Sequence, residues 1–354
     1  MKKNFLITTG GSGGHVIPAC ILYEHLMGDY NVIISTDKRG LKYFDKDLSQ
    51  LEIINMPKLN NIFFLPFNIF FIFFLFIKSI ILLNRNKIDK IFSTGGYMSL
   101  PIILAAKFLR KDIYLIEPNQ VLGRANKFFL RSCRKIFCYT DKLLNFPENQ
   151  KKKIIKIFPL VKKYIYELQS SSNSNDKIKL LVVGGSQGAK IFDNDLKNVI
   201  VNISKHIPLK IIHQTSKKNI PLLSDFYLKN DIENEIFNFE KNIAVMINQT
   251  DICITRAGAS TLAELSFLNI PFIAVPLPTS KDNHQFENAN FYRNNDCCWI
   301  IEENLFEKTI EKTLKHILEK KIDYLNKKRN LKKLNYQNTW INVNQKILNN
   351  INEN

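Results

Sequence analysis

A histidine at the end of a glycine-rich loop is the first arrangement in this chain that could do chemistry. The loop reads GGSGGH and ends at His15, after a short apolar run over residues 4–8 and before helical spacing over 19–27. This order indicates a strand, a glycine loop and a helix. Backbone amides in such a loop can approach a phosphate, and an imidazole exchanges protons near neutral pH. The pattern predicts an anion site with a candidate base beside it.

The same pattern returns about half a chain later. Residues 179–183 form an apolar run that ends in GGSQGAK, and a helical stretch follows around 192–203. Neither loop is a P-loop, because Lys190 lies between alanine and isoleucine where a Gly-Lys-Ser/Thr ending is required. Neither fits the dinucleotide-binding fingerprint, since the glycines of the first loop are spaced too tightly. The duplication predicts two similar α/β domains, each opening with a glycine turn at the carboxyl end of its first strand.

A further motif, TRAGASTLAEL over residues 255–265, predicts a strand end followed by a helix start. Gly258 permits a tight turn, and Ser260 or Thr261 can cap the helix. Glu264 lies about one turn inside the helix, where its carboxylate could accept hydrogen bonds from the two hydroxyls of a ribose. Alternatively, it serves only the helix dipole. The proline-stiffened loop that follows places three polar side chains where they could reach sugar hydroxyls: Asn283, His284 and Gln285.

These motifs need a scaffold of parallel strands, and the rest of the chain has the pattern for one. The polar run SSSNSND over residues 170–176 is typical of a flexible connection near a domain boundary. We therefore expect an α/β protein of two domains, with a lysine-rich helical tail. Further buried strands, alternating with helices in the second half as a parallel sheet requires, are predicted at residues 87–92, 112–116, 210–213, 251–255 and 271–275.

The composition agrees with two folded domains and narrows the partners. The chain has 354 residues, of which 45% are hydrophobic, so each of two domains can bury a core. Its formal charge of +18 calls for nucleic acid, an anionic membrane or a phosphorylated substrate, or else reflects a compositional bias toward lysine. The basic residues are dispersed and accompany no nucleic-acid-binding motif, so we expect no nucleic-acid partner.

The cysteines and acidic residues predict neither a metal site nor a cofactor. The six cysteines are scattered, without the spacing of a metal site, and are typical of reduced thiols in the cytoplasm. The first residues lack the long apolar run of a secretory signal. No Asp-x-Asp stands in an evident metal-binding loop, so we expect no catalytic metal.

The segment NIFFLPFNIFFIFFLFIKSIILL, residues 61–83, has enough apolar length to cross a bilayer. Three interpretations are open: a buried core helix, a transmembrane helix, and a helix that lies in the membrane interface. Pro66 and Lys78 interrupt the segment, and a crossing in the middle of an α/β domain would separate the parts of one sheet. The interfacial helix avoids this, with Lys78, Arg85 and Lys87 placed to meet anionic headgroups.

Four motifs in this order resemble the MurG family of N-acetylglucosaminyltransferases: GGSGGHVIPA at 10–19, TGGYMSLP at 94–101, VVGGSQGA at 182–189, and TRAGASTLAEL with PLPTSKDNHQFENA. The resemblance covers about residues 3–289. It implies a GT-B fold, in which two Rossmann-like domains with parallel sheets face a cleft. It also implies inverting transfer of GlcNAc from UDP-GlcNAc to the 4-hydroxyl of MurNAc in undecaprenyl-diphospho-MurNAc-pentapeptide, a step of peptidoglycan synthesis.

The family's organisation implies three parts of the chain and a location. Residues 1–162 correspond to an N-terminal domain that binds the acceptor and the membrane, and residues 163–338 to a C-terminal domain that binds UDP-GlcNAc. Residues 339–354 correspond to a helix that returns to the N-terminal domain. Peripheral attachment to anionic lipids at the cytoplasmic face of the bacterial inner membrane, through an apolar patch, is also implied.

Family roles carry over onto matching positions. The helix from Ala259 to Glu264 would bind uridine and phosphate, Gln285 would face the GlcNAc, and the backbone at Glu240 would cradle uracil. Lys162 departs from the pattern, because the family commonly has an arginine there and lysine lacks its planar fork. The positions assigned to substrate binding are Ser12, Gly13, Gly14, Asn119, Lys162, Ser186, Gln187, Glu240, Ala259, Ser260, Thr261, Leu262, Ala263, Glu264 and Gln285.

Inverting transfer needs a base for the acceptor hydroxyl and stabilisation of the departing UDP. His15 is the candidate base, unless it holds the loop or contacts the acceptor diphosphate instead. Glu117 is the alternative base. Amides of the loop at Ser186 and of the helix that starts near Gly258 would meet the charge on the leaving diphosphate.

Two other classes of protein stay open at the level of sequence. One is a different GT-B enzyme, such as another lipid glycosyltransferase or a UDP-GlcNAc epimerase, which should lack the apolar patch and act without a lipid acceptor. The other is a membrane-binding or nucleic-acid-binding protein with degenerate catalytic loops, for which a salt-sensitive DNA complex would be the sign.

Overall fold

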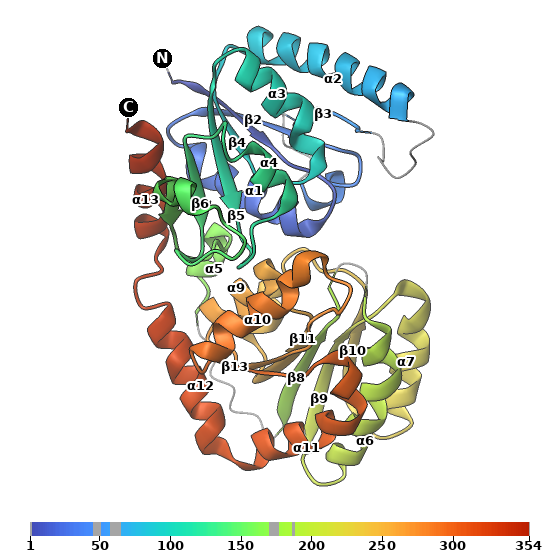
Figure 1. The fold of residues 1–354 in the computed structure, drawn as a ribbon. Helices are drawn as coiled ribbons and strands as arrows, with labels where there is room; N and C mark the ends of the chain where they lie inside the picture. Colours follow the sequence, from blue (N-terminus) through green and yellow to red (C-terminus); the bar gives the residue numbers. More distant parts are fainter. Residues whose placement is uncertain (1, 45–50, 57–64, 170–176, 186–187, 354) are drawn as a thin grey trace. The chain divides into compact units, whose positions relative to one another are not determined.

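The computed structural model describes residues 2–44, 51–56, 65–169, 177–185 and 188–353, and within this range only the backbone of residues 65–69. The chain divides into two compact units (Figure 1). The N-terminal unit comprises Met1–Lys163 and Thr339–Asn354, and the C-terminal unit comprises Tyr164–Asn338. Each unit is built around one parallel sheet with helices on both faces.

The sheet of the N-terminal unit is buried on both faces. Phe5, Leu6 and Ile7 of its central strand are fully buried, although neighbouring side chains of a strand point to opposite faces. Among the described residues, its strands lie in the order β3-β2-β1-β4-β5-β6-β7, all parallel. They are β1 (Asn4–Thr8), β2 (Asn31–Thr36), β3 (Leu51–Ile53), β4 (Ile88–Ser93), β5 (Asp112–Glu117), β6 (Lys135–Cys138) and β7 (Ile154–Lys156).

Two helical layers cover this sheet. One face packs against α2 (Leu65–Arg85), α3 (Leu100–Phe108) and α4 (Arg124–Phe129). The other face packs against α1 (Gly13–Leu26) and the last helix, α13 (Trp340–Asn352). The ring of His25 on α1 stacks on Trp340 with centroids 3.6 Å apart, and the hydroxyl of Tyr30 donates to Asn352 Oδ1 at 2.6 Å. The end of the chain therefore belongs structurally to the N-terminal unit.

The C-terminal unit repeats the plan. Among the described residues its strands lie in the order β10-β9-β8-β11-β12-β13. They are β8 (Ile178–Val183), β9 (Leu209–Gln214), β10 (Glu233–Phe237), β11 (Ile252–Thr255), β12 (Phe272–Ala274) and β13 (Cys298–Ile300). One face carries α6 (Lys197–Ser204), α7 (Ile220–Leu228) and α11 (Phe306–Glu319). The other carries α8 (Ile243–Asn248), α9 (Ala259–Phe267), α10 (His284–Asn294) and α12 (Lys321–Leu334), while α5 (Lys163–Tyr166) lies at the boundary between the units.

Both sheets change winding direction at one place, and this positions the sequence motifs. The switch lies between β1 and β4 in one unit and between β8 and β11 in the other. In open parallel sheets, ligands bind outside the carboxyl ends of the strands at such a switch. The predicted α/β class, with parallel sheets and a glycine turn after the first strand of each, is confirmed.

Helix α2 carries an apolar face that the core does not use. Leu75, Ser79, Leu82 and Leu83 are buried, so one side of the helix packs inward. The other side exposes five large apolar side chains: Phe70, Phe73, Phe74, Ile77 and Ile81. Helix α2 is therefore no buried core helix over its described side chains, while residues 61–64 lie outside the described part. Nowhere in that part does a helix reach the length and hydropathy of a membrane span.

Candidate functional site

The first glycine loop brings His15 against the second glycine motif. Helix α1 begins at Gly13, and the carbonyl of Ser12 accepts from the His15 amide at 3.1 Å. His15 Nδ1 lies 2.8 Å from the carbonyl oxygen of Thr94. A Cβ on Gly95 would stand 3.4 Å from the imidazole Cε1, and one on Gly96 3.4 Å from Cδ2. The absence of side chains there makes room for the ring.

This contact fixes the tautomer of His15. A carbonyl oxygen can only accept, so Nδ1 must carry the proton that it shares with Thr94. Nε2 then holds a lone pair, which is what a general base requires. Ser12 and Gly14 are exposed beside it, whereas Gly13 is buried, because a Cβ there would lie 3.1 Å from the ring of Tyr43.

Glu117 is buried and its carboxylate is occupied. Oε1 accepts from the amide of Asn119 at 3.2 Å and from Asn119 Nδ2 at 2.9 Å. Oε2 accepts from the amide of Gly123 at 2.8 Å and from Asn126 Nδ2 at 2.9 Å. With 2% of the residue exposed and four donors in place, Glu117 organises the loop after β5. The geometry therefore favours His15 over Glu117 as the base.

Asn126 is a residue of this site that the sequence analysis missed. Its Nδ2 also donates to the carbonyl of Ile116 at 2.9 Å, and a Cβ on Gly95 would stand 3.4 Å from it. It connects the loop after β5 to the loop that holds His15. A single asparagine in a short helix gives no sequence signal for such a role.

The third glycine loop follows β8 and needs its first glycine. A Cβ on Gly184 would lie 2.5 Å from the amide nitrogen of Ala189, which no side chain can tolerate. Gly185 and Gly188 have φ of +79° and +72°, in the left-handed region that favours glycine. Ser186 and Gln187, which were assigned to substrate binding, lie outside the described residues.

Helix α9 starts at the carboxyl end of β11, as predicted, but its cap differs. The N-cap residue is Gly258, and no side chain in the described part of the chain caps the helix. The prediction that Ser260 or Thr261 caps it is wrong, because the helix begins at Ala259 and both residues lie in its first turn. The first bond inside the helix runs from the Leu262 amide to the Gly258 carbonyl at 3.0 Å. The amides before Leu262 thus have no acceptor within the helix.

The remaining positions of this motif face inward. Leu262 and Ala263 bury their side chains in the core, so a ligand could reach only their backbone. Glu264 is 7% exposed, which leaves a small part of its surface at the edge of the unit.

Gln285 connects two loops at the same strand ends. Its Oε1 accepts from the amides of Ala257, at 3.2 Å, and Leu277, at 3.0 Å. Arg256, also missed by the sequence analysis, donates Nη1 to the carbonyl of Val275 at 3.2 Å and pairs through Nη2 with Glu303 at 2.5 Å. Both residues hold the loops after β11 and β12 together.

The other assigned residues are divided between the units. Asn119 is tied to Glu117 and lies in the N-terminal unit, as does Lys162, a half-buried residue just before α5. Glu240 lies in the C-terminal unit, where its Oε1 accepts from the amide of Asn242 at 2.7 Å beside the start of α8.

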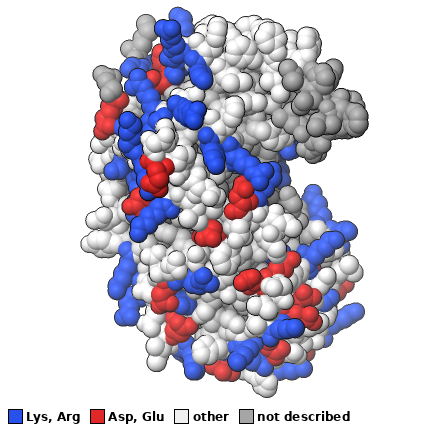
Figure 2. All heavy atoms as spheres, viewed as in Figure 1, with Lys and Arg blue, Asp and Glu red and all other residues white. Residues whose placement is uncertain are grey.

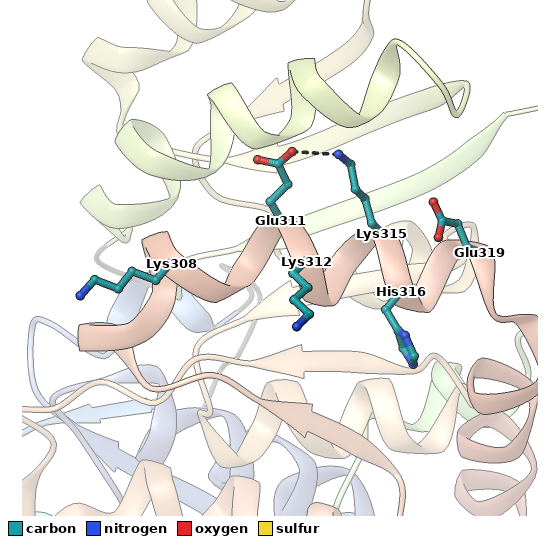
Figure 3. A pocket seen from close by; sticks show the side chains of 6 residues that line it. All are labelled: Lys308, Glu311, Lys312, Lys315, His316 and Glu319. Carbon is teal, nitrogen blue, oxygen red and sulfur yellow. Dashed lines mark hydrogen bonds and ion pairs between the residues drawn. The ribbon is translucent and has the colours of Figure 1, made fainter.

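A surface pocket of about 500 Å³ lies elsewhere, along α11 (Figure 3). Glu311 and Lys315 point toward each other from the helix and pair at 3.0 Å, while Lys312 and His316 project from another side. None of the assigned site residues lines it, and its mixed charges are typical of a solvated helix face. Within the described residues, no group of His, Cys, Asp and Glu side chains could hold a metal ion.

Comparisons with known proteins agree with this geometry. A crystal structure of Acinetobacter baumannii MurG superposes with a TM-score of 0.73 at 20% identity, covering 94% of this chain and 95% of that one. A UDP-N-acetylglucosamine 2-epimerase superposes with a TM-score of 0.63 at 13% identity, covering 93% and 91%. These likenesses define the class of the fold, which is the GT-B class of two-domain α/β enzymes.

Sequence relatives narrow the class to a family. The N-terminal domain model of glycosyltransferase family 28 matches residues 5–138, and the C-terminal domain model of that family matches residues 179–339. The chain belongs to glycosyltransferase family 28. It is 48% identical, over the full length of both chains, to the UDP-N-acetylglucosamine--N-acetylmuramyl-(pentapeptide) pyrophosphoryl-undecaprenol N-acetylglucosamine transferase of Pelagibacter ubique. The protein of the same name from Rickettsia canadensis is 36% identical over 85% of this chain and 86% of its own length. The resemblance drawn from the four motifs is confirmed.

Proposed function

We propose that this enzyme transfers GlcNAc from UDP-GlcNAc to the 4-hydroxyl of MurNAc in undecaprenyl-diphospho-MurNAc-pentapeptide, with inversion at the anomeric carbon. Full-length similarity to the Pelagibacter ubique transferase supports the two substrates. The observation that carries the chemistry is the contact of His15 Nδ1 with the Thr94 carbonyl, which leaves Nε2 free of a proton.

Each bond change then has a residue to serve it. His15 Nε2 takes the proton of the acceptor hydroxyl while its oxygen attacks the anomeric carbon of GlcNAc. The bond from that carbon to UDP breaks, and the electron pair leaves on the diphosphate. Glycine-loop amides after β8 and the first amides of α9 are suited to bind that anion, and backbone dipoles fixed in advance are the strongest means of stabilising it.

Binding to the membrane surface is part of the proposal, because the acceptor is a lipid. The exposed side of α2 places Phe70, Phe73, Phe74 and Ile77 on one face, as an interfacial helix requires. Phe108 on α3 extends this face, since it is 69% exposed and its ring centroid lies 5.9 Å from that of Phe76. The surface over α2 is largely uncharged in Figure 2. We infer peripheral attachment to the cytoplasmic leaflet of the bacterial inner membrane.

Nucleic acid is a poorer partner for the basic charge. On the face shown in Figure 2, Lys and Arg side chains are spread over both units and mixed with acidic ones in the C-terminal unit. A nucleic-acid site would gather them in one stripe or patch.

The direct test is transfer of radiolabelled GlcNAc from UDP-GlcNAc to a short-chain analogue of the lipid acceptor. We expect label to move into the lipid fraction, with no transfer when the acceptor is omitted. Folded protein that forms no labelled lipid would contradict the proposal.

A further inference from the structure

Arg39 is a half-exposed arginine beside the first glycine loop that the chemistry above does not use. Its Nε donates to Asp37 Oδ2 at 2.6 Å, and its Nη2 donates to the hydroxyl of Tyr97 at 2.9 Å. The side chain of Asp37 is 4% exposed, whereas that of Arg39 is 48% exposed. A buried carboxylate therefore fixes one edge of the guanidinium, and Nη1 has no acceptor among the described residues.

Asp37 ties this arginine to the loop that carries His15. Its Oδ1 accepts from the amide of Gly11 at 2.9 Å and from the amide of Gly40 at 3.0 Å. A Cβ on Gly11 would stand 3.7 Å from Arg39 Nη2, so the guanidinium lies over the loop backbone. One carboxylate thus sets the positions of both the loop and the arginine.

Tyr97 holds the other side of the guanidinium. The Arg39 Cζ atom lies 5.7 Å from the centre of the Tyr97 ring, and the tyrosine oxygen accepts from Nη2, so its own hydrogen is available to donate. Tyr97 directly follows Gly96, where a Cβ would lie 3.4 Å from His15 Cδ2. Arg39, Tyr97 and His15 are therefore gathered around the carboxyl ends of three adjacent strands, β2, β1 and β4.

We propose that Arg39 binds a phosphate of the acceptor's diphosphate and thereby presents the acceptor hydroxyl to His15. The inference rests on the proposed function, which supplies the acceptor. A guanidinium held along one edge keeps its remaining N–H groups in a planar fork, which matches phosphate oxygens. The diphosphate is attached to the same sugar ring that carries the reacting hydroxyl, so one loop can hold the first and expose the second.

The alternative is that the Asp37–Arg39 pair only stiffens the loop. A stiffening pair should affect stability and both substrates alike, whereas a phosphate ligand should affect the acceptor alone. Arg134 offers a matched control, because its Nε pairs with Asp112 at 2.7 Å and its side chain is 50% exposed. Asp112 begins β5, so this second pair lies at the opposite edge of the same sheet.

The test compares steady-state kinetics of Arg39→Met, Arg39→Lys and Arg134→Met at saturating concentrations of the other substrate. We expect Arg39→Met to raise KM for the lipid acceptor by about 10- to 100-fold, the range of a charge-assisted hydrogen bond. Its KM for UDP-GlcNAc should stay within about twofold of wild type, and Arg134→Met should change neither. Arg39→Lys should recover part of the acceptor affinity, because it keeps the charge without the fork.

A binding measurement separates this inference from the proposed function. Titration with a short prenyl diphosphate, which has no sugar to react, should show about 10-fold weaker binding to Arg39→Met than to wild type or Arg134→Met. Wild-type protein that makes no lipid product would refute the function, while this titration would still decide the role of Arg39. Equal prenyl diphosphate affinity in all variants, or an equal rise of both KM values in Arg39→Met, would overturn the inference.

Discussion

At the scale of single residues, the strongest feature is the orientation of His15. Because the Thr94 carbonyl accepts from Nδ1, the proton-accepting nitrogen is settled before any substrate arrives. His15→Ala should lower kcat by about 10²- to 10⁴-fold, the usual contribution of a general base, with little change in UDP-GlcNAc affinity. Single-turnover kinetics and donor titration measure the two effects. A variant with near wild-type turnover would disprove the base assignment.

Glu117 should behave as a positioning residue. Glu117→Gln replaces one acceptor oxygen by an NH2 group that must face existing donors, from Asn119 on one side or Gly123 and Asn126 on the other. We expect a loss of about 1–3 kcal/mol in the free energy of unfolding, together with lower activity. The pH profile of the remaining activity should keep its wild-type shape. A variant of unchanged stability that loses the limb of the base would instead make Glu117 the base.

The sequence revealed the residues with a local signature and missed those defined only by their neighbours. Glycines before His15 and around Gly258 announce themselves by composition, because a tight turn needs them. Asn126 and Arg256 act through partners that lie far away along the chain, at Glu117, Val275 and Glu303, and no spacing encodes those contacts. The misplaced cap on α9 has a local cause, since Gly258 itself can serve as N-cap and starts the helix earlier.

At the scale of elements, helix α2 is built for two environments. Leu75, Leu82 and Leu83 pack inward, whereas Phe73 and Phe74 are 58% and 59% exposed. Hydrophobicity alone could not distinguish a core helix from an interfacial one, because both faces of α2 are apolar. The distinction needed the neighbouring helix α3, which covers only one of those faces.

The double variant Phe73→Ser/Phe74→Ser should weaken membrane binding and leave the fold intact. Each phenylalanine side chain contributes about 1.5–3 kcal/mol when it leaves water, so partial insertion of two should be worth at least tenfold in the partition coefficient. Sedimentation with vesicles containing anionic lipid measures this coefficient. Leu222→Ser/Leu228→Ser is the matched control, since both leucines are exposed on α7, at 70% and 60%. Equal vesicle binding by both double variants would contradict a role for α2.

At the scale of the whole molecule, the fold was predictable and its closure was not. Strands separated by helices, with a glycine turn after the first strand of each half, are enough to indicate two parallel sheets. The buried stack of His25 on Trp340, by contrast, joins residues that are far apart in the sequence and has no local signature. It attaches α13 to the N-terminal unit and should make stability depend on pH.

Burial lowers the pKa of His25 from 6.5 to about 4, although its hydrogen bond with Asn344 acts in the other direction. The unfolded chain therefore binds a proton between about pH 6.5 and 4 that the folded protein excludes, so stability falls as the pH drops through this window. The loss amounts to about 3 kcal/mol below pH 4. His25→Gln removes this contribution. We expect urea unfolding at pH 8 and pH 4 to show a smaller decrease for the variant, and equal decreases would contradict it.

The central claim is acceptor-dependent transfer of GlcNAc with inversion, and product analysis tests it most directly. Purified protein is incubated with UDP-GlcNAc, with and without a short-chain lipid acceptor, and the products are identified by mass spectrometry and NMR. We predict a β-linked disaccharide lipid and UDP in equal amounts, and no reaction when the acceptor is left out. An α linkage, or conversion of UDP-GlcNAc to its 2-epimer without any acceptor, would contradict the account.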